Sequence, residues 1–159
     1  MADVCLLGTG GMLPLKDRFL TSLYVEYNGK AVLIDCGEGT QVAMAVHGLK
    51  MSRIEMILFT HAHADHVMGL TGLLLSVGNS SRTAPLDIYA PESCVPVIEK
   101  LVSLCGALPY EVRINSLKEN EMCSFTAEGL DPMLTIKALP LSHTVSCMGY
   151  SLILERKPV

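Results

Sequence analysis

Residues 61–66 read His61-Ala62-His63-Ala64-Asp65-His66, and this run holds three of the five histidines in the chain. It follows the apolar stretch 56–59, which we expect to form a buried strand. In an extended segment that leaves a strand, residues 61, 63 and 65 project to one side, and residue 66 turns toward the next element. Two imidazoles can then face one metal ion, while a carboxylate and a third imidazole face a second ion.

This donor set predicts metal chemistry, because imidazole and carboxylate groups suit zinc, manganese or iron. Two such ions about 3.5–4 Å apart activate a water molecule and stabilise the leaving oxygen in hydrolysis. The alternative is a set of unrelated, solvated loop histidines. The clustered arrangement is favoured, since histidine is otherwise scarce in the chain. The run therefore indicates a metal-dependent hydrolase.

His47 has a structural interpretation instead. It lies near the end of a helix expected over residues 38–47, directly before Gly48. An imidazole at a helix C-terminus, followed by a glycine cap, is ordinary structure.

Length and composition indicate a single domain over residues 1–159, with enough chain to bury a core. Hydrophobic residues make up 50% of the sequence, yet the longest apolar segment, 70–77, is too short to span a bilayer. We expect no membrane partner. The N-terminus has no signal-peptide pattern, and six scattered cysteines without a CxxC pair predict free thiols in a reducing compartment, the cytosol.

The formal net charge of −4 gives no general attraction to nucleic acid, and the sequence has no long basic run. If the substrate is RNA, attraction must come from a local patch, from the metal ions, or from sequence outside this chain.

The hydrophobic pattern predicts an α/β fold, with strands and helices interleaved first and β-hairpins later. Asn28-Gly29 is a two-residue hairpin signal between strands 21–27 and 31–34. An apolar helix broken by glycines is expected over 67–77. The candidate site residues stand at strand ends and in the loops that follow, where α/β enzymes place their chemistry.

Asp35 and His143 are candidates to complete the site. Asp35 ends a strand before a glycine-rich turn, where it can orient a metal ligand; an Asp–Gly turn at a helix start is the alternative. A first metal ion bound by His61 and His63 needs a further ligand, and His143 is the spare histidine in a strand-end loop. A buried histidine bonded to the backbone is the alternative for His143.

Three cations are candidate phosphate contacts. Lys16 and Arg18 lie in a glycine-flanked loop, and Arg82 follows Asn79 in a polar loop. Each of them is also consistent with a solvated loop cation.

With these residues placed, the chain resembles the metallo-β-lactamase superfamily and, within it, the amino-terminal half of the ribonuclease Z (tRNA 3′-processing endonuclease) family. The superfamily pattern is the run 61–66 with the downstream His143. The family-level motifs are Leu6-Leu7-Gly8-Thr9-Gly10-Gly11, Pro14-Leu15-Lys16-Asp17-Arg18, Leu33-Ile34-Asp35-Cys36-Gly37-Glu38-Gly39-Thr40-Gln41, and Phe59-Thr60-His61 followed by Gly69-Leu70-Thr71-Gly72-Leu73-Leu74. They cover nearly the whole chain.

The resemblance implies an αββα sandwich, of which this chain supplies roughly the first half, and two zinc ions, with manganese or iron as alternatives. His61, His63 and His143 would bind one ion, and Asp65 and His66 the other. Asp65 would also accept a proton during attack on phosphorus, Asp35 would support the ligands, and the loop around Lys16 and Arg18 would contact RNA. The implied reaction is endonucleolytic removal of the 3′ trailer from precursor tRNA.

The chain departs from the family in two positions and in length. Phe19 stands where the family often has asparagine, and Ala64 where it often has glycine. Family members are about twice as long, and their second half supplies a bridging aspartate and a last histidine ligand. Residues 144–159 contain neither an aspartate nor a histidine. We therefore expect a chain that is incomplete alone and is completed by a carboxy-terminal half or by a second copy in a homodimer.

Two other functions stay open. The first is a hydrolase of the same superfamily that acts on a small phosphodiester or an ester. The second is a non-catalytic, metal-binding half that works only as a subunit, which the high apolar content favours.

Overall fold

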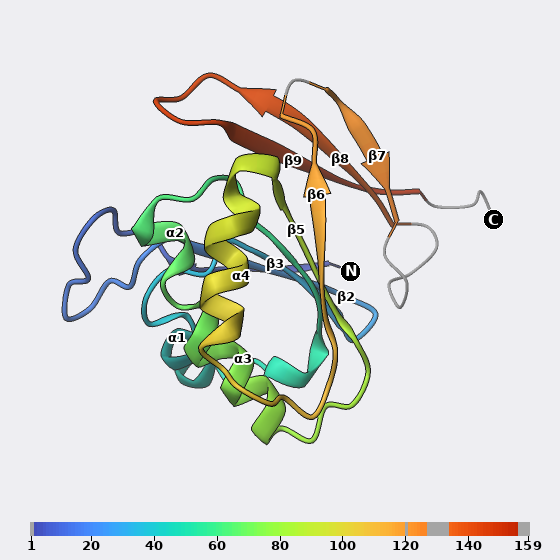
Figure 1. Cartoon of the computed structure of the whole chain (residues 1–159). Helices are drawn as coiled ribbons and strands as arrows, with labels where there is room; N and C mark the ends of the chain where they lie inside the picture. The colour runs from blue at the N-terminus through green and yellow to red at the C-terminus, as the bar shows by residue number, and fades with distance from the viewer. Residues whose placement is uncertain (1, 120, 127–133, 156–159) are drawn as a thin grey trace.

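The computed structural model describes residues 2–119, 121–126 and 134–155, which form two β-sheets and a layer of helices (Figure 1). The larger sheet has the strand order β1 (Asp3–Gly8), β2 (Ser22–Tyr27), β3 (Lys30–Ile34), β4 (Ile54–Leu58), β5 (Leu86–Pro91), β6 (Val112–Leu117). The smaller sheet has the order β7 (Cys123–Phe125), β8 (Leu134–Leu141), β9 (Cys147–Leu154). The helices are α1 (Thr40–Val46), α2 (Ala64–Val67), α3 (Leu70–Asn79) and α4 (Val95–Ser103), with 3₁₀ turns η1 (Met51–Arg53) and η2 (Glu92–Cys94).

The larger sheet changes from antiparallel to parallel at β3. β1, β2 and β3 are antiparallel neighbours, and β3 to β6 run parallel. The expected hairpin joins β2 to β3, with φ of 50° at Asn28 and 75° at Gly29, as a primed two-residue turn requires. Parallel neighbours need crossover connections, and here each crossover contains a helix. The carboxyl ends of β3, β4 and β5 therefore meet at one edge of the sheet.

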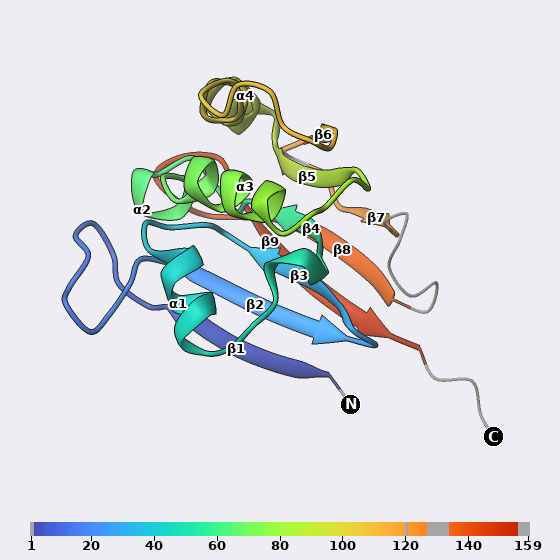
Figure 2. The same cartoon turned by 90° about the horizontal axis from the view of Figure 1, so that it is seen from below.

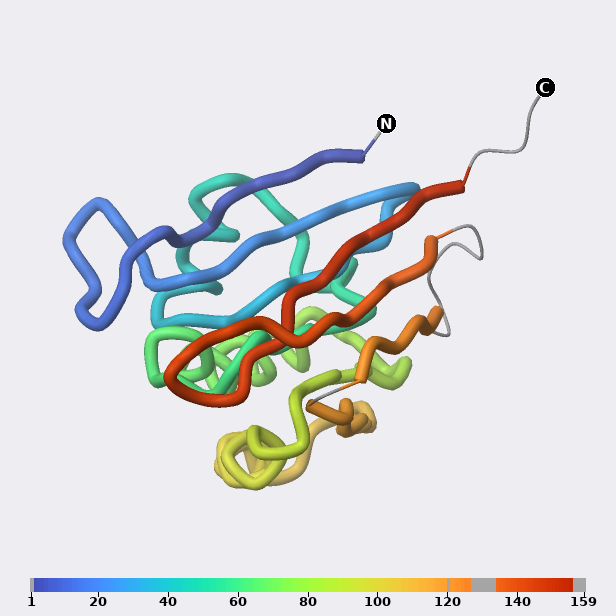
Figure 3. Tube along the Cα trace, turned by 90° about the horizontal axis from the view of Figure 1, so that it is seen from above, coloured from blue at the N-terminus to red at the C-terminus, as the bar shows by residue number. Residues whose placement is uncertain are grey.

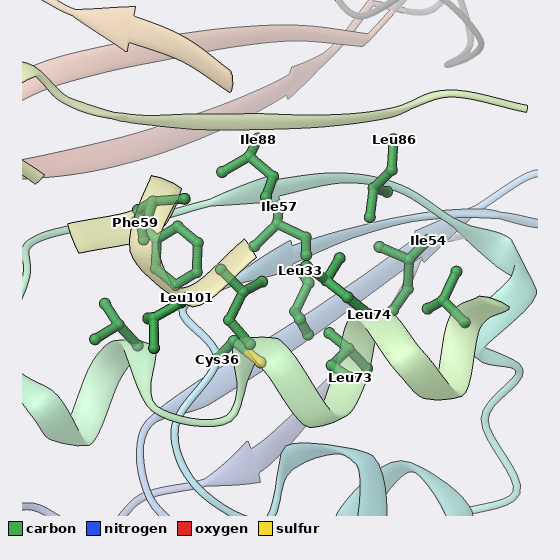
Figure 4. Close-up of a cluster of buried hydrophobic side chains, with 14 of the residues drawn as sticks. Leu33, Cys36, Ile54, Ile57, Phe59, Leu73, Leu74, Leu86, Ile88 and Leu101 are labelled. Atoms are coloured by element: carbon green, nitrogen blue, oxygen red, sulfur yellow. The ribbon is translucent and has the colours of Figure 1, made fainter. Parts of the chain in front are cut away.

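The sheet separates two apolar cores, because alternate residues of its central strands face opposite sides. On one side, Leu33 and Ile57 belong to the same core as Leu73 and Leu74 of α3 (Figure 4). Met56 belongs to the second core, which packs against side chains of β8 and β9. Seen from below, the helices and the β7–β9 sheet lie on opposite faces of the larger sheet (Figure 2).

The predicted α/β class is confirmed, and the elements form three successive layers, α, β and β, as expected for part of an αββα sandwich. Within the residues that the structure describes, no helix covers the outer face of the β7–β9 sheet, which faces the viewer in Figure 3. None of the described helices is long and apolar enough to cross a lipid bilayer.

The apolar helix expected over 67–77, broken by glycines, is observed as two helices, α2 and α3, with the break at Met68 and Gly69. The reason is a close backbone approach. The Gly69 N–H donates to the Cys36 carbonyl at 2.9 Å, and a Cβ on Gly69 would lie 2.1 Å from the carbonyl oxygen of Gly37. His47 is the C-cap of α1 and Gly48 has a φ of 67°, so the structural interpretation of His47 is confirmed.

Two neighbouring leucines of α3 test the helix-side core. Leu74 is fully buried, whereas Leu75 is 43% exposed. We expect Leu74→Ala to lower the free energy of unfolding by about 2–5 kcal/mol, because it leaves a cavity, and Leu75→Ala to change it by less than about 0.5 kcal/mol. Urea denaturation of both variants measures the difference, and equal effects would contradict the packing described here.

Candidate metal centre

The first two histidines leave β4 in an extended segment. Residues 61–63 lie between the end of β4 and the start of α2, and His63 has φ −65° and ψ 145°. His61 is buried at 5% exposure, and its Nε2 lies 3.0 Å from Nδ1 of His63. The two side chains converge as the alternation of an extended chain predicts.

The third histidine comes from the smaller sheet. His143 lies between β8 and β9, and its ring centroid is 4.7 Å from that of His61 and 5.1 Å from that of His63. One nitrogen from each of the three rings lies within 4.8 Å of the others. Three imidazole nitrogens that converge in this way fit a zinc-type ion, so the described residues are compatible with the metal expected from the sequence.

Two hydrogen bonds from β9 to backbone carbonyls hold the β8–β9 loop over the site. The Met148 N–H donates to the Thr60 carbonyl at 2.9 Å, and the Tyr150 hydroxyl donates to the Phe59 carbonyl at 2.7 Å. Both contacts join β9 to the segment that directly precedes His61. Residues distant in sequence are therefore fixed beside one another before any ligand binds.

Asp65 and His66 form a second donor pair. Asp65 Oδ2 lies 3.6 Å from His66 Nε2, and the His66 ring lies 4.0 Å from the His61 ring between centroids. The extended segment ends at His63, so Asp65 and His66 belong to the first turn of α2 rather than to an alternating strand. The expectation that residue 65 projects by strand alternation was wrong, although its carboxylate still lies beside the histidines.

Asp35 supports His66, and the structure makes its position clear. Its side chain is buried, with Oδ2 2.8 Å from His66 Nδ1. The backbone of Asp35 has a φ of 59°, in the left-handed region that aspartate tolerates better than most residues. This conformation turns the chain out of β3 and aims the carboxylate at the histidines.

Close packing of two turns makes that contact possible. The Cys36 N–H donates to the His66 carbonyl at 2.7 Å, which joins the turn after β3 to α2. A Cβ on Gly37 would lie 2.4 Å from the Asp65 carbonyl oxygen, so only glycine allows this approach.

The electrostatic surroundings give the two central histidines opposite pKa shifts. Burial, together with the imidazoles of His66, His63 and His143, lowers the pKa of His61 to about 4, although the Asp35 carboxylate opposes the shift. Burial also lowers the pKa of His66, but the hydrogen bond and charge of Asp35 and the charge of Asp65 outweigh it, and the net shift is upward. His61 is therefore neutral near pH 7, as a metal ligand must be.

Sequence reasoning missed two groups at the site. The Thr60 hydroxyl lies 2.9 Å from His61 Nδ1 and 2.8 Å from Asp35 Oδ2. The Cys147 thiol lies 4.0 Å from the same nitrogen of His61. The position of Thr60 directly before the histidine run was the available signal for it; the sequence holds no comparable signal for Cys147.

The loop with Lys16 and Arg18 lies beside the site and projects from the body of the molecule (Figure 1). The Met12 N–H lies 3.4 Å from Asp65 Oδ2, so the beginning of this loop touches the second donor pair. Lys16 and Arg18 are exposed and, together with His47, line a hollow of about 410 Å³ between the loop and α1.

Arg82 is not brought to the site. Its side chain is 4% exposed, and its guanidinium donates to the carbonyls of Ile54, Ala84 and Pro85 and to the carboxylate of Glu55. Four of the five N–H groups of an arginine are occupied by these contacts. The Arg82 side chain is therefore buried and its hydrogen-bond donors are occupied. It has a structural role, and not the phosphate contact expected from the sequence.

The chain is similar in sequence to known proteins over nearly all of its length. A family model described as anti-Pycsar protein Apyc1 matches residues 2–158. The ribonuclease Z of Clostridium acetobutylicum is 46% identical and covers 99% of this chain but only 51% of its own length. The ribonuclease Z of Agathobacter rectalis is 45% identical, with 98% and 50% covered. The chain spans about half the length of the curated relatives it matches, and the expected resemblance to ribonuclease Z is confirmed.

Solved structures agree with the fold. The short form of human tRNase Z (ELAC1) superposes with a TM-score of 0.81 and 29% identity, over 97% of this chain and 65% of the human chain. The metallo-β-lactamase fold protein YhfI from Bacillus subtilis has a TM-score of 0.73 at 18% identity, over 95% of this chain and 57% of its own, which supports the fold alone.

The role of Arg82 can be tested against an exposed arginine. We expect Arg82→Ala to lower the free energy of unfolding by about 2–4 kcal/mol, because it leaves buried carbonyl groups and Glu55 without their partner. Arg53→Ala, which removes a side chain 38% exposed and paired with Glu26, should cost less than about 1 kcal/mol. Urea denaturation measures both values. Unchanged stability of the Arg82 variant, with weaker RNA binding, would restore the phosphate contact instead.

Proposed function

Since the chain belongs to the family described as anti-Pycsar protein Apyc1 and is similar to about half of each ribonuclease Z it matches, we propose that it is the amino-terminal half of a metal-dependent phosphodiesterase. The proposed substrate is precursor tRNA, with removal of the 3′ trailer. The chain then forms one part of a metallo-β-lactamase-like domain over residues 1–159. The observation that carries the proposal is the convergence of His61, His63 and His143.

The metal-binding residues follow from the donor geometry. His61, His63 and His143 would hold one ion, and Asp65 with His66 would supply donors for a second. Zinc suits these imidazole and carboxylate groups, as manganese or iron also would. Such ions, when bound, polarise a phosphoryl oxygen and lower the pKa of a water molecule.

The protein groups bind and orient the reacting partners. Asp65 lies at the rim between the histidines and the Met12 backbone, where its carboxylate can accept a proton from the attacking water. A hollow of about 270 Å³, lined by Ala62, His63, Ser93, Val145 and Ser146, adjoins the histidines and provides space for part of a substrate.

RNA binding by this acidic chain requires a local attraction. Lys16 and Arg18 supply two exposed cations on a loop that also touches Asp65 through Met12. The two cations line a hollow with α1 that contains none of the candidate metal ligands, so a phosphate bound there would belong to a part of the RNA away from the cleaved bond. The exposure of both cations on a loop that begins beside Asp65 supports the proposed role of the loop in RNA contact.

An apolar hollow supports the proposal that further polypeptide completes the fold. It has a volume of about 320 Å³ and lies between strands β1–β3 and β9, lined by side chains that include Leu23, Val25, Tyr150 and Leu152. The curated relatives are about twice as long as this chain. We propose that a carboxy-terminal half covers this apolar hollow. The homodimer stays a prediction. The cytosol also stays a prediction, consistent with six cysteines that are all free.

A small phosphodiester is the second candidate substrate. The family model that matches residues 2–158 has a description that does not include ribonuclease activity. Membership of that family therefore leaves the substrate open. In a chimaera that joins this chain to the unmatched half of a ribonuclease Z, turnover of a precursor tRNA and of bis(p-nitrophenyl) phosphate at matched concentration separates the candidates. Much faster use of the small ester would favour this alternative.

His63→Ala tests the metal centre. We expect zinc affinity to fall by more than about 100-fold, because the variant removes a direct ligand. His47→Ala is the matched control, since it removes a histidine that caps α1, and it should leave zinc affinity unchanged. Competition with a chromophoric chelator measures both, and equal affinity of the two variants would contradict the assigned ligands.

The double variant Lys16→Ala/Arg18→Ala tests the RNA contact. For each phosphate that the two cations neutralise, the slope of log affinity for precursor tRNA against log salt should decrease by about 1 in the variant. Lys118→Ala, which removes a lysine 75% exposed after the end of β6, is the control and should preserve the slope. A slope unchanged by the double variant would remove this loop from the RNA interface.

Catalysis is tested in a chimaera that joins this chain to the unmatched half of the Clostridium acetobutylicum ribonuclease Z. We expect trailer cleavage by the chimaera and its loss on His63→Ala. A folded, metal-loaded chimaera without any phosphodiesterase activity would favour the non-catalytic subunit.

A further inference from the structure

Thr60 lies where the two sheets meet, between the group of His61, His63 and His143 and the pair of Asp65 and His66. Its N–H donates to Asp35 Oδ1 at 2.8 Å, and its carbonyl accepts the N–H of Met148 at 2.9 Å. The backbone of Thr60 is thus held from β3 on one side and from β9 on the other. The direction of its side chain is set by the fold.

The hydroxyl of Thr60 joins a carboxylate to an imidazole. Oγ1 lies 2.8 Å from Asp35 Oδ2 and 2.9 Å from His61 Nδ1. A carboxylate only accepts hydrogen bonds, and a hydroxyl has a single proton to donate. Thr60 therefore donates to Asp35 and accepts from His61, which requires the proton of the neutral His61 ring to be on Nδ1.

The same count applies to His66. Its Nδ1 lies 2.8 Å from Asp35 Oδ2, so this nitrogen must donate to the carboxylate. In their neutral forms, both rings then carry their proton on Nδ1 and present an unprotonated Nε2, as a metal ligand must. Nε2 of His61 lies 3.0 Å from Nδ1 of His63, and Nε2 of His66 lies 3.6 Å from Oδ2 of Asp65. Each Nε2 therefore points toward the other candidate ligands of its metal ion.

From this arrangement we propose that Thr60 is a positioning residue, whose hydroxyl extends the orienting effect of Asp35 to His61. The buried carboxylate of Asp35 then sets the ring orientation and tautomer of one proposed ligand of each metal ion. It acts on His66 directly and on His61 through Thr60. The inference deepens the proposed metal site and rests on it. Thr60 itself does not contact substrate or metal.

Cys147 is the competing partner of His61 among the described residues. Its Sγ lies 4.0 Å from His61 Nδ1, and sulfur is a weak hydrogen-bond acceptor. The Thr60 oxygen is much closer and is itself oriented by Asp35. Cys147→Ala should therefore leave the tautomer of His61 unchanged, which separates the hydroxyl from the thiol as the controlling group.

The experiment compares three threonine variants of the 159-residue chain. Thr60→Val keeps the shape and removes the hydroxyl, Thr60→Ser restores it, and Thr71→Val removes a threonine hydroxyl that donates to the Leu101 carbonyl, away from the site. We expect Thr60→Val to weaken zinc binding about 10–100-fold, the range typical of groups that orient metal ligands. The Thr60→Ser and Thr71→Val variants should bind zinc within about threefold of the parent chain.

A second measurement reads the hydrogen bond without metal. Long-range ¹H–¹⁵N spectra of the histidine rings report which nitrogen is protonated. The parent chain should show His61 protonated on Nδ1, and Thr60→Val should lose that preference while Cys147→Ala retains it.

Two results would overturn the proposal: zinc affinity of Thr60→Val equal to that of the parent chain, or a parent chain with His61 protonated on Nε2. If Thr60→Val does not fold, the tautomer in the parent chain decides alone. A parent chain that binds no zinc overturns the proposed metal site, and the ring spectra still decide whether Thr60 orients His61.

Discussion

The carboxylate of Asp35 accepts three hydrogen bonds, from the N–H of Thr60, from the hydroxyl of Thr60 and from Nδ1 of His66. A buried carboxylate is strongly unfavourable unless such partners surround it, so the position of each donor is constrained by the others. Asp35 follows β3, Thr60 follows β4, and His66 belongs to α2. This one group therefore aligns three separate segments at the edge of the sheet, and the metal-binding geometry depends on it.

The smaller sheet supplies His143, the third histidine of the group at the edge of the larger sheet. β9 bonds to Phe59 and Thr60 through Tyr150 and Met148, and this contact carries the loop with His143 over the histidine run. The apolar side chains of β8 and β9 that pack on Met56 and Leu58 stabilise the contact. The three-histidine group is therefore complete only where the smaller sheet packs on the larger one, and these contacts preorganise the ligand set.

Much of this arrangement could be predicted from the sequence, because its signals are local. The run 61–66 indicates its chemistry through residue type and spacing, and Asn28-Gly29 indicates the hairpin through its turn conformation. Other features depend on partners distant in the chain. The burial of Arg82 follows from carbonyl groups such as that of Ile54, and the approach of Gly69 to Gly37 is the reason why the expected glycine break falls at that residue. Thr60 is an ordinary residue type whose role appears only once Asp35 and His61 lie on either side of it.

We propose that this chain supplies most of the ligands of a dinuclear hydrolytic centre. Anomalous diffraction at the zinc edge, from crystals of the 159-residue chain grown with zinc, tests it most directly. We predict one peak among the nitrogens of His61, His63 and His143, with any second peak between Asp65 and His66. Zinc bound to other residues, with none among these three histidines, would contradict the claim.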